Sequence, residues 1–91
     1  MEILDNIIEN WDYNSKDDIY SHFYKYMAIN NVFFLSNVYV FYDNSDNDNV
    51  IVITDKNRNV ITEIYLIEID KFSLSKKVAL FYANGYEIYL S

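Results

Sequence analysis

The first apolar pattern in the chain has the period of a helix. Within residues 2–12 the large apolar side chains recur at helical spacing, and acidic residues recur between them at intervals of three and four. The apolar positions are Ile3, Leu4, Ile7, Ile8 and Trp11, and the acidic positions are Glu2, Asp5, Glu9 and Asp12. The pattern predicts an amphipathic helix whose acidic face is solvated. Carboxylates spaced by one helical turn, ~5.4 Å, can alternatively imitate a row of phosphates.

A second helix is predicted from about residue 15 to residue 30. Asn14 or Ser15 would cap it, and two acids follow in its first turn. Its apolar stripe is Ile19, Phe23 and Met27. His22 is the only histidine, and its neighbour one turn on, Tyr26, is not a metal ligand. We therefore expect His22 to be a partly exposed helix residue without a catalytic role.

From residue 32 onward, β-branched and aromatic residues predominate, which is typical of strands. Two of the predicted runs, Val32–Leu35 and Val38–Tyr42, form either one strand with a bulge at Ser36-Asn37 or two short strands. Two further strands, Val50–Thr54 and Val60–Ile69, complete a three-stranded meander. The last two strands are apolar on both alternating faces, so they need cover from the rest of the chain, a second copy or a partner.

Residues 75–91 are compatible with two structures. Asn84-Gly85 separates Val78–Ala83 from Tyr86–Leu90, and Asn-Gly between β-rich runs is the strongest short signal for a hairpin. The alternative is a helix from Ser75 to Asn84 that ends at Gly85. Lysines 76 and 77 would oppose the dipole of that helix, so the sequence favours the hairpin, preceded by a loop over residues 71–77.

Together these elements predict a single α+β domain over residues 1–91. Two N-terminal helices would pack on an antiparallel sheet of about five strands, the meander plus the C-terminal hairpin. The strand order and the oligomeric state are left open by the sequence, and a homodimer built on the two-sided apolar strands is one of the options.

Charge is distributed unevenly along the chain. The net charge is −7, and residues 1–50 hold nine acids and two bases, whereas residues 51–91 hold five of each. This sign disfavours direct binding of nucleic acid and favours a partner protein with a basic surface. There is no cysteine, no secretion signal pattern and no apolar run of about 18 residues. We expect a protein of the bacterial cytoplasm that does not enter a membrane.

The sequence contains no pattern of residues for catalysis or for a cofactor. A single histidine, a single glycine and no cysteine leave no nucleophile turn, phosphate loop or zinc site. The loop Asp43–Asn49 is rich in oxygen ligands, but Asp48 and Thr54 stand where a calcium loop requires Gly and Glu. We expect a polar hairpin loop there, with an adventitious cation site as the alternative, and no enzyme activity, cofactor or metal.

Two short segments resemble the phage-encoded uracil-DNA glycosylase inhibitors. One is the opening helix, with Leu4, Ile7, Ile8 and Glu9, and the other is the hairpin, with Tyr42, Asp43, Ser45, Asn49, Val50 and Thr54. The matched segments cover about a quarter of the chain. In that family a Glu-Ser-Ile stretch lies on the first strand, whereas its nearest counterpart here, Asp17-Asp18-Ile19, is predicted to start a helix.

The resemblance implies an inhibitor that imitates DNA, with helices packed on a five-stranded antiparallel sheet. Glu9, Asp17, Asp18 and Asp43 would replace phosphates. An apolar pocket formed by Met27, Val38, Ile51 and Ile53 would capture a side chain of the enzyme, although a plain core role also explains these residues. Uracil-DNA glycosylase is the expected target. The alternatives are inhibition of a CRISPR effector or another defence nuclease, immunity against a basic nuclease toxin, and a structural homodimer.

Overall fold

The computed structural model describes residues 2–44 and 48–91, and within these it is mostly β. Its elements are α1 (Glu2–Asn10), β1 (Asp12–Asn14), β2 (Ile19–Ile29), β3 (Val32–Asp43), β4 (Val50–Thr54), β5 (Val60–Tyr65), the 3-10 turn η1 (Leu66–Glu68), β6 (Ile69–Leu74), β7 (Ala79–Ala83) and β8 (Tyr86–Leu90). The predicted fold class is therefore wrong. Eight strands and one short helix replace two helices on about five strands.

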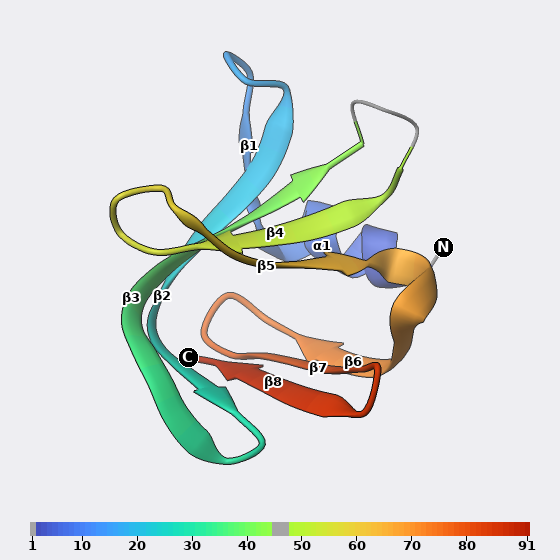
Figure 1. The fold of residues 1–91 in the computed structure, drawn as a ribbon. Coiled ribbons are helices and arrows are strands. Elements are labelled where there is room, and N and C mark those ends of the chain that lie inside the picture. The colour runs from blue at the N-terminus through green and yellow to red at the C-terminus, as the bar shows by residue number, and fades with distance from the viewer. Residues whose placement is uncertain (1, 45–47) are drawn as a thin grey trace.

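All eight strands belong to one antiparallel sheet that folds over on itself. Seven follow the order β5-β4-β3-β2-β8-β7-β6. One edge of β2 pairs with β3, and its other edge is shared, with β1 at the start of the strand and β8 at the end. Figure 1 shows the result as two facing layers, joined by the long β2–β3 hairpin, with α1 behind the space between them. The predicted meander of β3, β4 and β5 is confirmed.

A bulge bends β2 from one layer into the other. The amides of Lys25 and Tyr26 both donate to the carbonyl of Ser91, at 2.9 and 3.0 Å, and the Ser91 amide donates back to Tyr26. In a β-bulge, two residues of one strand lie opposite one residue of its neighbour. The bulge bends the strand and changes which side chains face the core. Accordingly, the fully buried side chain is Tyr24 before the bulge and Met27 after it.

The predicted second helix is wrong, because residues 19–29 form β2. Apolar residues at every fourth position, Ile19, Phe23 and Met27, fit a helical stripe, but four is also twice the period of a strand. The intervening Tyr, His and Phe residues have strand propensity, and pairing with β3 over the whole length of β2 decides the outcome. His22 is accordingly a strand residue and is half-buried.

Two tight hairpin turns have the same backbone geometry. Asn84 and Gly85 have φ of 54° and 81°, and Asn30 and Asn31 have φ of 52° and 65°. Positive φ at both central residues is typical of a type I′ turn, which Asn and Gly tolerate best. The C-terminal hairpin is thus confirmed and the alternative helix is wrong. Asn30-Asn31, expected near a helix end, is the β2–β3 turn.

The predicted strand Val60–Ile69 is interrupted. Its first part is β5 in one layer, its last residue begins β6 in the other, and η1 makes the crossing with Leu66 buried. The loop expected at residues 71–77 is therefore strand as far as Leu74. In β3, the single-strand alternative is confirmed, but its bulge lies at Phe34 and not at the predicted Ser36-Asn37. Met27 pairs with Leu35 and Ala28 pairs with Phe33, so Phe34 has no partner residue on β2 in this register. Asn37 has a positive φ of 62°.

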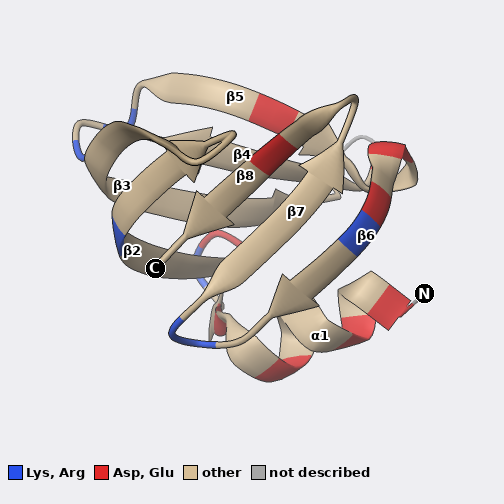
Figure 2. Cartoon of the chain, turned by 90° about the horizontal axis from the view of Figure 1, so that it is seen from below, with Lys and Arg blue, Asp and Glu red and all other residues tan. Residues whose placement is uncertain are grey.

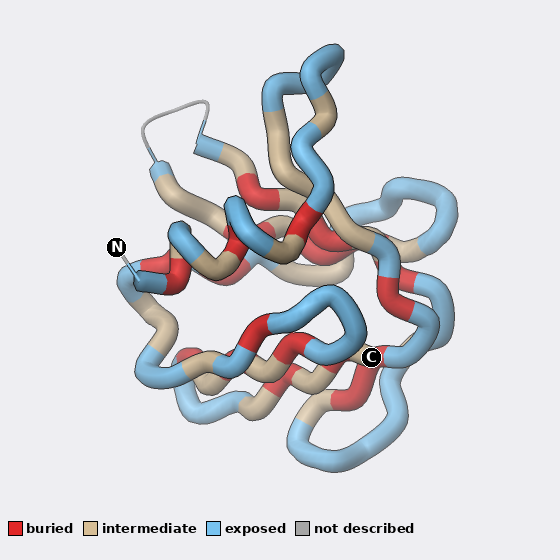
Figure 3. The backbone as a smooth tube through the Cα atoms, turned by 180° about the vertical axis from the view of Figure 1, so that it is seen from behind, coloured by how far each residue is buried: buried red, intermediate tan, exposed pale blue. Residues whose placement is uncertain are grey.

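The core lies between the two layers and is closed by α1, whose prediction is confirmed. The helix contributes its buried face, while each layer contributes the inward side of its strands. The core members with no exposed surface are Ile7, Met27, Val38, Val40, Ile51, Ile53, Ala79, Phe81 and Leu90. In Figure 3, buried and exposed positions alternate along the strands, as expected for a sheet with one face in the core.

Candidate protein-binding surface

The outer face of α1 is acidic. Glu2, Asp5 and Glu9 are exposed, and the helix contains no basic residue. Ile3 and Ile7 are buried beneath them, and the Trp11 Nε1 donates to the Tyr24 hydroxyl at 3.1 Å, which fixes the end of the helix to β2. Figure 2 shows the acidic positions along the outside of α1. The helix therefore presents carboxylates on a rigid support.

The turn between β1 and β2 holds two further carboxylates in defined positions. Asn14 Nδ2 donates to Asp17 at 2.8 Å, and the Tyr13 hydroxyl donates to Asp18. The hydrogen bond to Asp18, together with its negative charge, raises the pKa of Tyr13. Asp17 and Asp18 are exposed, and Asp18 has a φ of 57°. The turn thus displays two carboxylates that are held by neighbouring side chains.

A groove of about 490 Å³ runs beside this turn. One side is polar and acidic, with Asp12, Asn14 and Asp17. The other side is aromatic, and we call Phe23, Tyr39 and Phe41 the aromatic platform. Phe23 is 40% exposed, and its ring centroid lies 5.2 Å from that of Tyr39. Carboxylates and aromatic rings, of which Phe23 is exposed and Tyr39 and Phe41 are half-buried, therefore line one groove.

Arg58 completes the groove from the β4–β5 loop. Its guanidinium carbon lies 3.9 Å from the centroid of the Tyr39 ring and 5.1 Å from that of Phe41, which is cation–π geometry. Asp55 shapes this loop by accepting the amides of Asn57 and Asn59 at 2.8 and 2.9 Å. These hydrogen bonds, led by that from Asn59, lower the pKa of Asp55.

His22 lines the same groove but is engaged elsewhere. Its Nε2 lies 2.6 Å from the carbonyl oxygen of Lys76, and its ring packs edge-on against Tyr24, with centroids 4.9 Å apart. The contact ties β2 to the β6–β7 loop. This arrangement gives the histidine a structural role between the two segments.

The predicted phosphate-mimic residues lie on three elements. Glu9 is on α1, Asp17 and Asp18 are in the β1–β2 turn, and Asp43 is half-buried at the end of β3. In Figure 3 the helix that starts at the N label runs below the β1–β2 turn. Ser45 and Asp46, in the loop first considered for calcium, lie outside the described residues.

The four residues predicted to form an apolar pocket have no exposed surface. Met27, Val38, Ile51 and Ile53 are each 0% exposed and belong to the core between the layers. This placement agrees with the plain core role weighed for them above. The groove described here uses the opposite face of β3, because Tyr39 and Phe41 alternate with Val38 and Val40.

The aromatic platform and Arg58 are not evident as a site from the sequence. Strand alternation in β3 was sufficient to place Tyr39 and Phe41 on one face. The partners Phe23 and Arg58 could not be added, since residue 23 was assigned to a helix and residue 58 lies in a loop.

No protein-family model, curated protein or solved structure matches this chain. Within residues 2–44 and 48–91, no group of three or more His, Cys, Asp or Glu side chains is placed to hold a metal ion. Neither helical segment of the described chain has the length and apolarity needed to cross a membrane.

Proposed function

We propose that this protein is an inhibitor that binds the basic, DNA-contacting surface of another protein by imitating DNA. The observation that carries the proposal is the groove lined by Asp12, Asp17 and the aromatic platform. Charge complementary to a basic partner speeds encounter, and aromatic and Arg side chains in a concave site are typical anchors of protein interfaces.

The acidic face of α1 supplies further carboxylates outside the groove. Its carboxylates recur about one turn apart, which suits a partner that normally follows a phosphate backbone. A protein with net charge −7 repels nucleic acid itself, so imitation of DNA accounts for the charge better than binding of DNA does.

Uracil-DNA glycosylase is the first target to test, since the sequence resemblance names it. The protein is titrated into a bacterial glycosylase acting on a uracil-containing duplex. We expect stoichiometric loss of uracil excision. Full excision at a large excess of this protein would exclude uracil-DNA glycosylase as the target. Inhibition would then be tested in cleavage assays with an RNA-guided nuclease and with a basic nuclease toxin.

The mechanism is tested by charge reversal in the β1–β2 turn. We expect the double variant Asp17→Lys, Asp18→Lys to inhibit at least about tenfold more weakly at low salt, because it repels a basic surface. The wild-type affinity should fall as salt rises, and the difference between the proteins should narrow with it.

The matched control reverses two exposed acids outside the groove, Glu63→Lys and Asp70→Lys, with the same change in net charge. It should inhibit within about threefold of wild type if position matters more than total charge. Equal inhibition by the Asp17→Lys, Asp18→Lys variant and wild type, at low salt and at moderate salt, would disprove the mimicry.

A further inference from the structure

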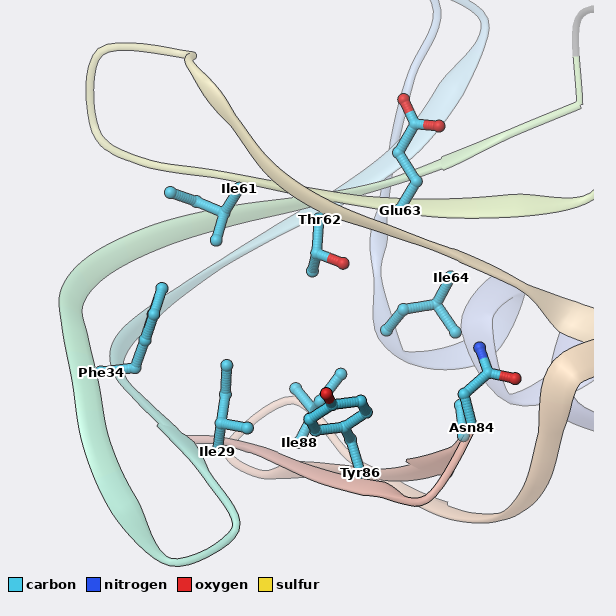
Figure 4. A pocket seen from close by; sticks show the side chains of 10 residues that line it. Ile29, Phe34, Ile61, Thr62, Glu63, Ile64, Asn84, Tyr86 and Ile88 are labelled. Atoms are coloured by element: carbon cyan, nitrogen blue, oxygen red, sulfur yellow. The ribbon is translucent and has the colours of Figure 1, made fainter.

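A separate apolar cleft opens on the side of the molecule where the sheet does not close. β5 and β6 are the two ends of the strand order, so no strand bridges the layers on this side. The cleft has a volume of about 340 Å³ and lies between β5 and the β7–β8 hairpin. Its apolar wall includes Ile29, Ile61, Ile64, Ala83 and Ile88. Figure 4 looks into this space.

Polar groups in the cleft are few and uncharged. Thr62 points from β5 toward the hairpin, and Tyr86 points back from β8 toward β5 (Figure 4). Glu63 is the one charged residue at the cleft, and its side chain points away from the cavity. Asn84, at one end, donates its Nδ2 to Glu68 of η1. The interior therefore offers hydrocarbon walls and two hydroxyl groups without a charge.

The volume limits what could occupy the cleft. A hydrocarbon-lined cavity of about 150 Å³ stays dry and accepts one benzene ring. A cleft of about 340 Å³ is a little more than twice as large. It matches a molecule of about two rings, and this volume lies at the lower end of the range for small-molecule sites, ~300–1,000 Å³.

We propose that this cleft binds a small neutral molecule of about two-ring size, mostly apolar, with one hydroxyl or carbonyl group directed at Thr62 and Tyr86. Binding is driven by the release of water from the hydrocarbon walls of the cleft. The hydroxyl groups of Thr62 and Tyr86 orient the polar end of the ligand. A charged ligand is disfavoured, because its charge would be desolvated without a partner inside the cleft.

The test uses 2-naphthol as the probe, a neutral two-ring molecule with one hydroxyl. It is titrated into the ¹⁵N-labelled full chain and followed by amide chemical shifts. We expect saturable shifts with one site per chain, concentrated in residues 61–64 and 83–88. Naphthalene-2-sulfonate, of similar shape but charged, should bind at least about tenfold more weakly. Equal binding of the two molecules, or no saturable shift up to the solubility limit of 2-naphthol, would overturn the proposal.

Neighbouring residues on β5 provide matched variants. Thr62→Phe places a ring inside the cleft and should weaken 2-naphthol binding at least about tenfold. Glu63→Phe adds the same ring on the outward side and should bind within about twofold of wild type. Ala83→Leu fills the cleft from the opposite wall and replaces Thr62→Phe if that variant does not fold. Retained binding in the filled variant, or equal loss in Glu63→Phe, would show that the probe sits elsewhere.

The titration is repeated at two protein concentrations, with the mass measured by light scattering. The proposal predicts the same affinity at both concentrations. If dimerisation at the higher concentration shifts the same amides and excludes the probe, a second copy of the chain is the occupant and the small-molecule assignment is wrong.

Discussion

The two ends of β2 present opposite surfaces. At its start, the turn with Asp17 and Asp18 is acidic and borders the groove proposed for a basic partner. At its end, the β2–β3 turn leads into Val32 and Phe33, which are 68% and 56% exposed, and nearby Phe34 borders the apolar cleft. Charge acts over a distance and is weakened by salt, whereas apolar surface acts only in contact. The two proposed sites at the ends of this strand should therefore differ in salt dependence.

The bulge in β2 is what separates these surfaces. Lys25 and Tyr26 share the carbonyl of Ser91, so the C-terminal residue of the chain holds the bend. Without the bend, a strand of eleven residues would keep one face toward the core along its whole length. The difference between the ends teaches that a single sheet can present two unlike sites when one strand passes from one layer to the other.

The contrast between the two ends of β2 assumes that both layers of the sheet unfold together. Phe81 is fully buried in β7, and its replacement by Ala should lower the free energy of unfolding by about 3–5 kcal/mol. Denaturation is followed by fluorescence of Trp11, a core residue next to α1 whose Nε1 donates to the Tyr24 hydroxyl of β2. One cooperative transition with this loss is expected. Two transitions, or a Trp11 signal that is unaffected, would show that each end of β2 belongs to its own folding unit.

A substitution at Gly85, in the β7–β8 turn beside the apolar cleft, tests the backbone at the apolar end of β2. Gly85 has a φ of 81° and nothing within 4 Å of a Cβ placed there, so Gly85→Ala adds backbone strain without a clash. We expect the free energy of unfolding to fall by about 1–2 kcal/mol. Gly85→Asn should cost less, since Asn tolerates positive φ. Equal losses for the two variants, measured by chemical denaturation, would contradict a purely conformational cause.

The smallest effect on the free energy of unfolding is expected from Asp55, in the β4–β5 loop that carries Arg58 near the acidic end of β2. The pKa of Asp55 is lowered in the folded protein, so folding favours its charged form. Its contribution to stability is complete above its ordinary pKa of 3.8 and is lost as the pH falls through the lower, folded-state value.

Asp55→Asn tests this linkage, because Asn does not titrate. Wild type should be the more stable protein at neutral pH, and its advantage should shrink as the pH falls below 3.8. Urea denaturation at a series of pH values measures the difference. An advantage that stays constant with pH would mean that Asp55 acts through shape alone.

Local signals determined several parts of this structure. The adjacent apolar pairs Ile3-Leu4 and Ile7-Ile8 favour a helix, since a strand that buried Ile3 and Ile7 would also turn Asp5 toward the core. Asn84-Gly85 likewise selects a tight turn, because both residues accept positive φ. The excess of acid in the first half was also visible in the sequence, and it became the acidic face of α1 and the β1–β2 turn.

Only the tertiary structure decided the rest. The every-fourth-residue stripe of β2 fits both a helix and a strand, and pairing with β3 and β8 selected the strand. The break at Leu66 arose because the chain must cross between layers. The groove and the cleft each combine residues from distant segments, such as Phe23 with Arg58. Their meeting depends on strand order and on the bend in β2, which are set by long-range pairing and have no local signature in the sequence.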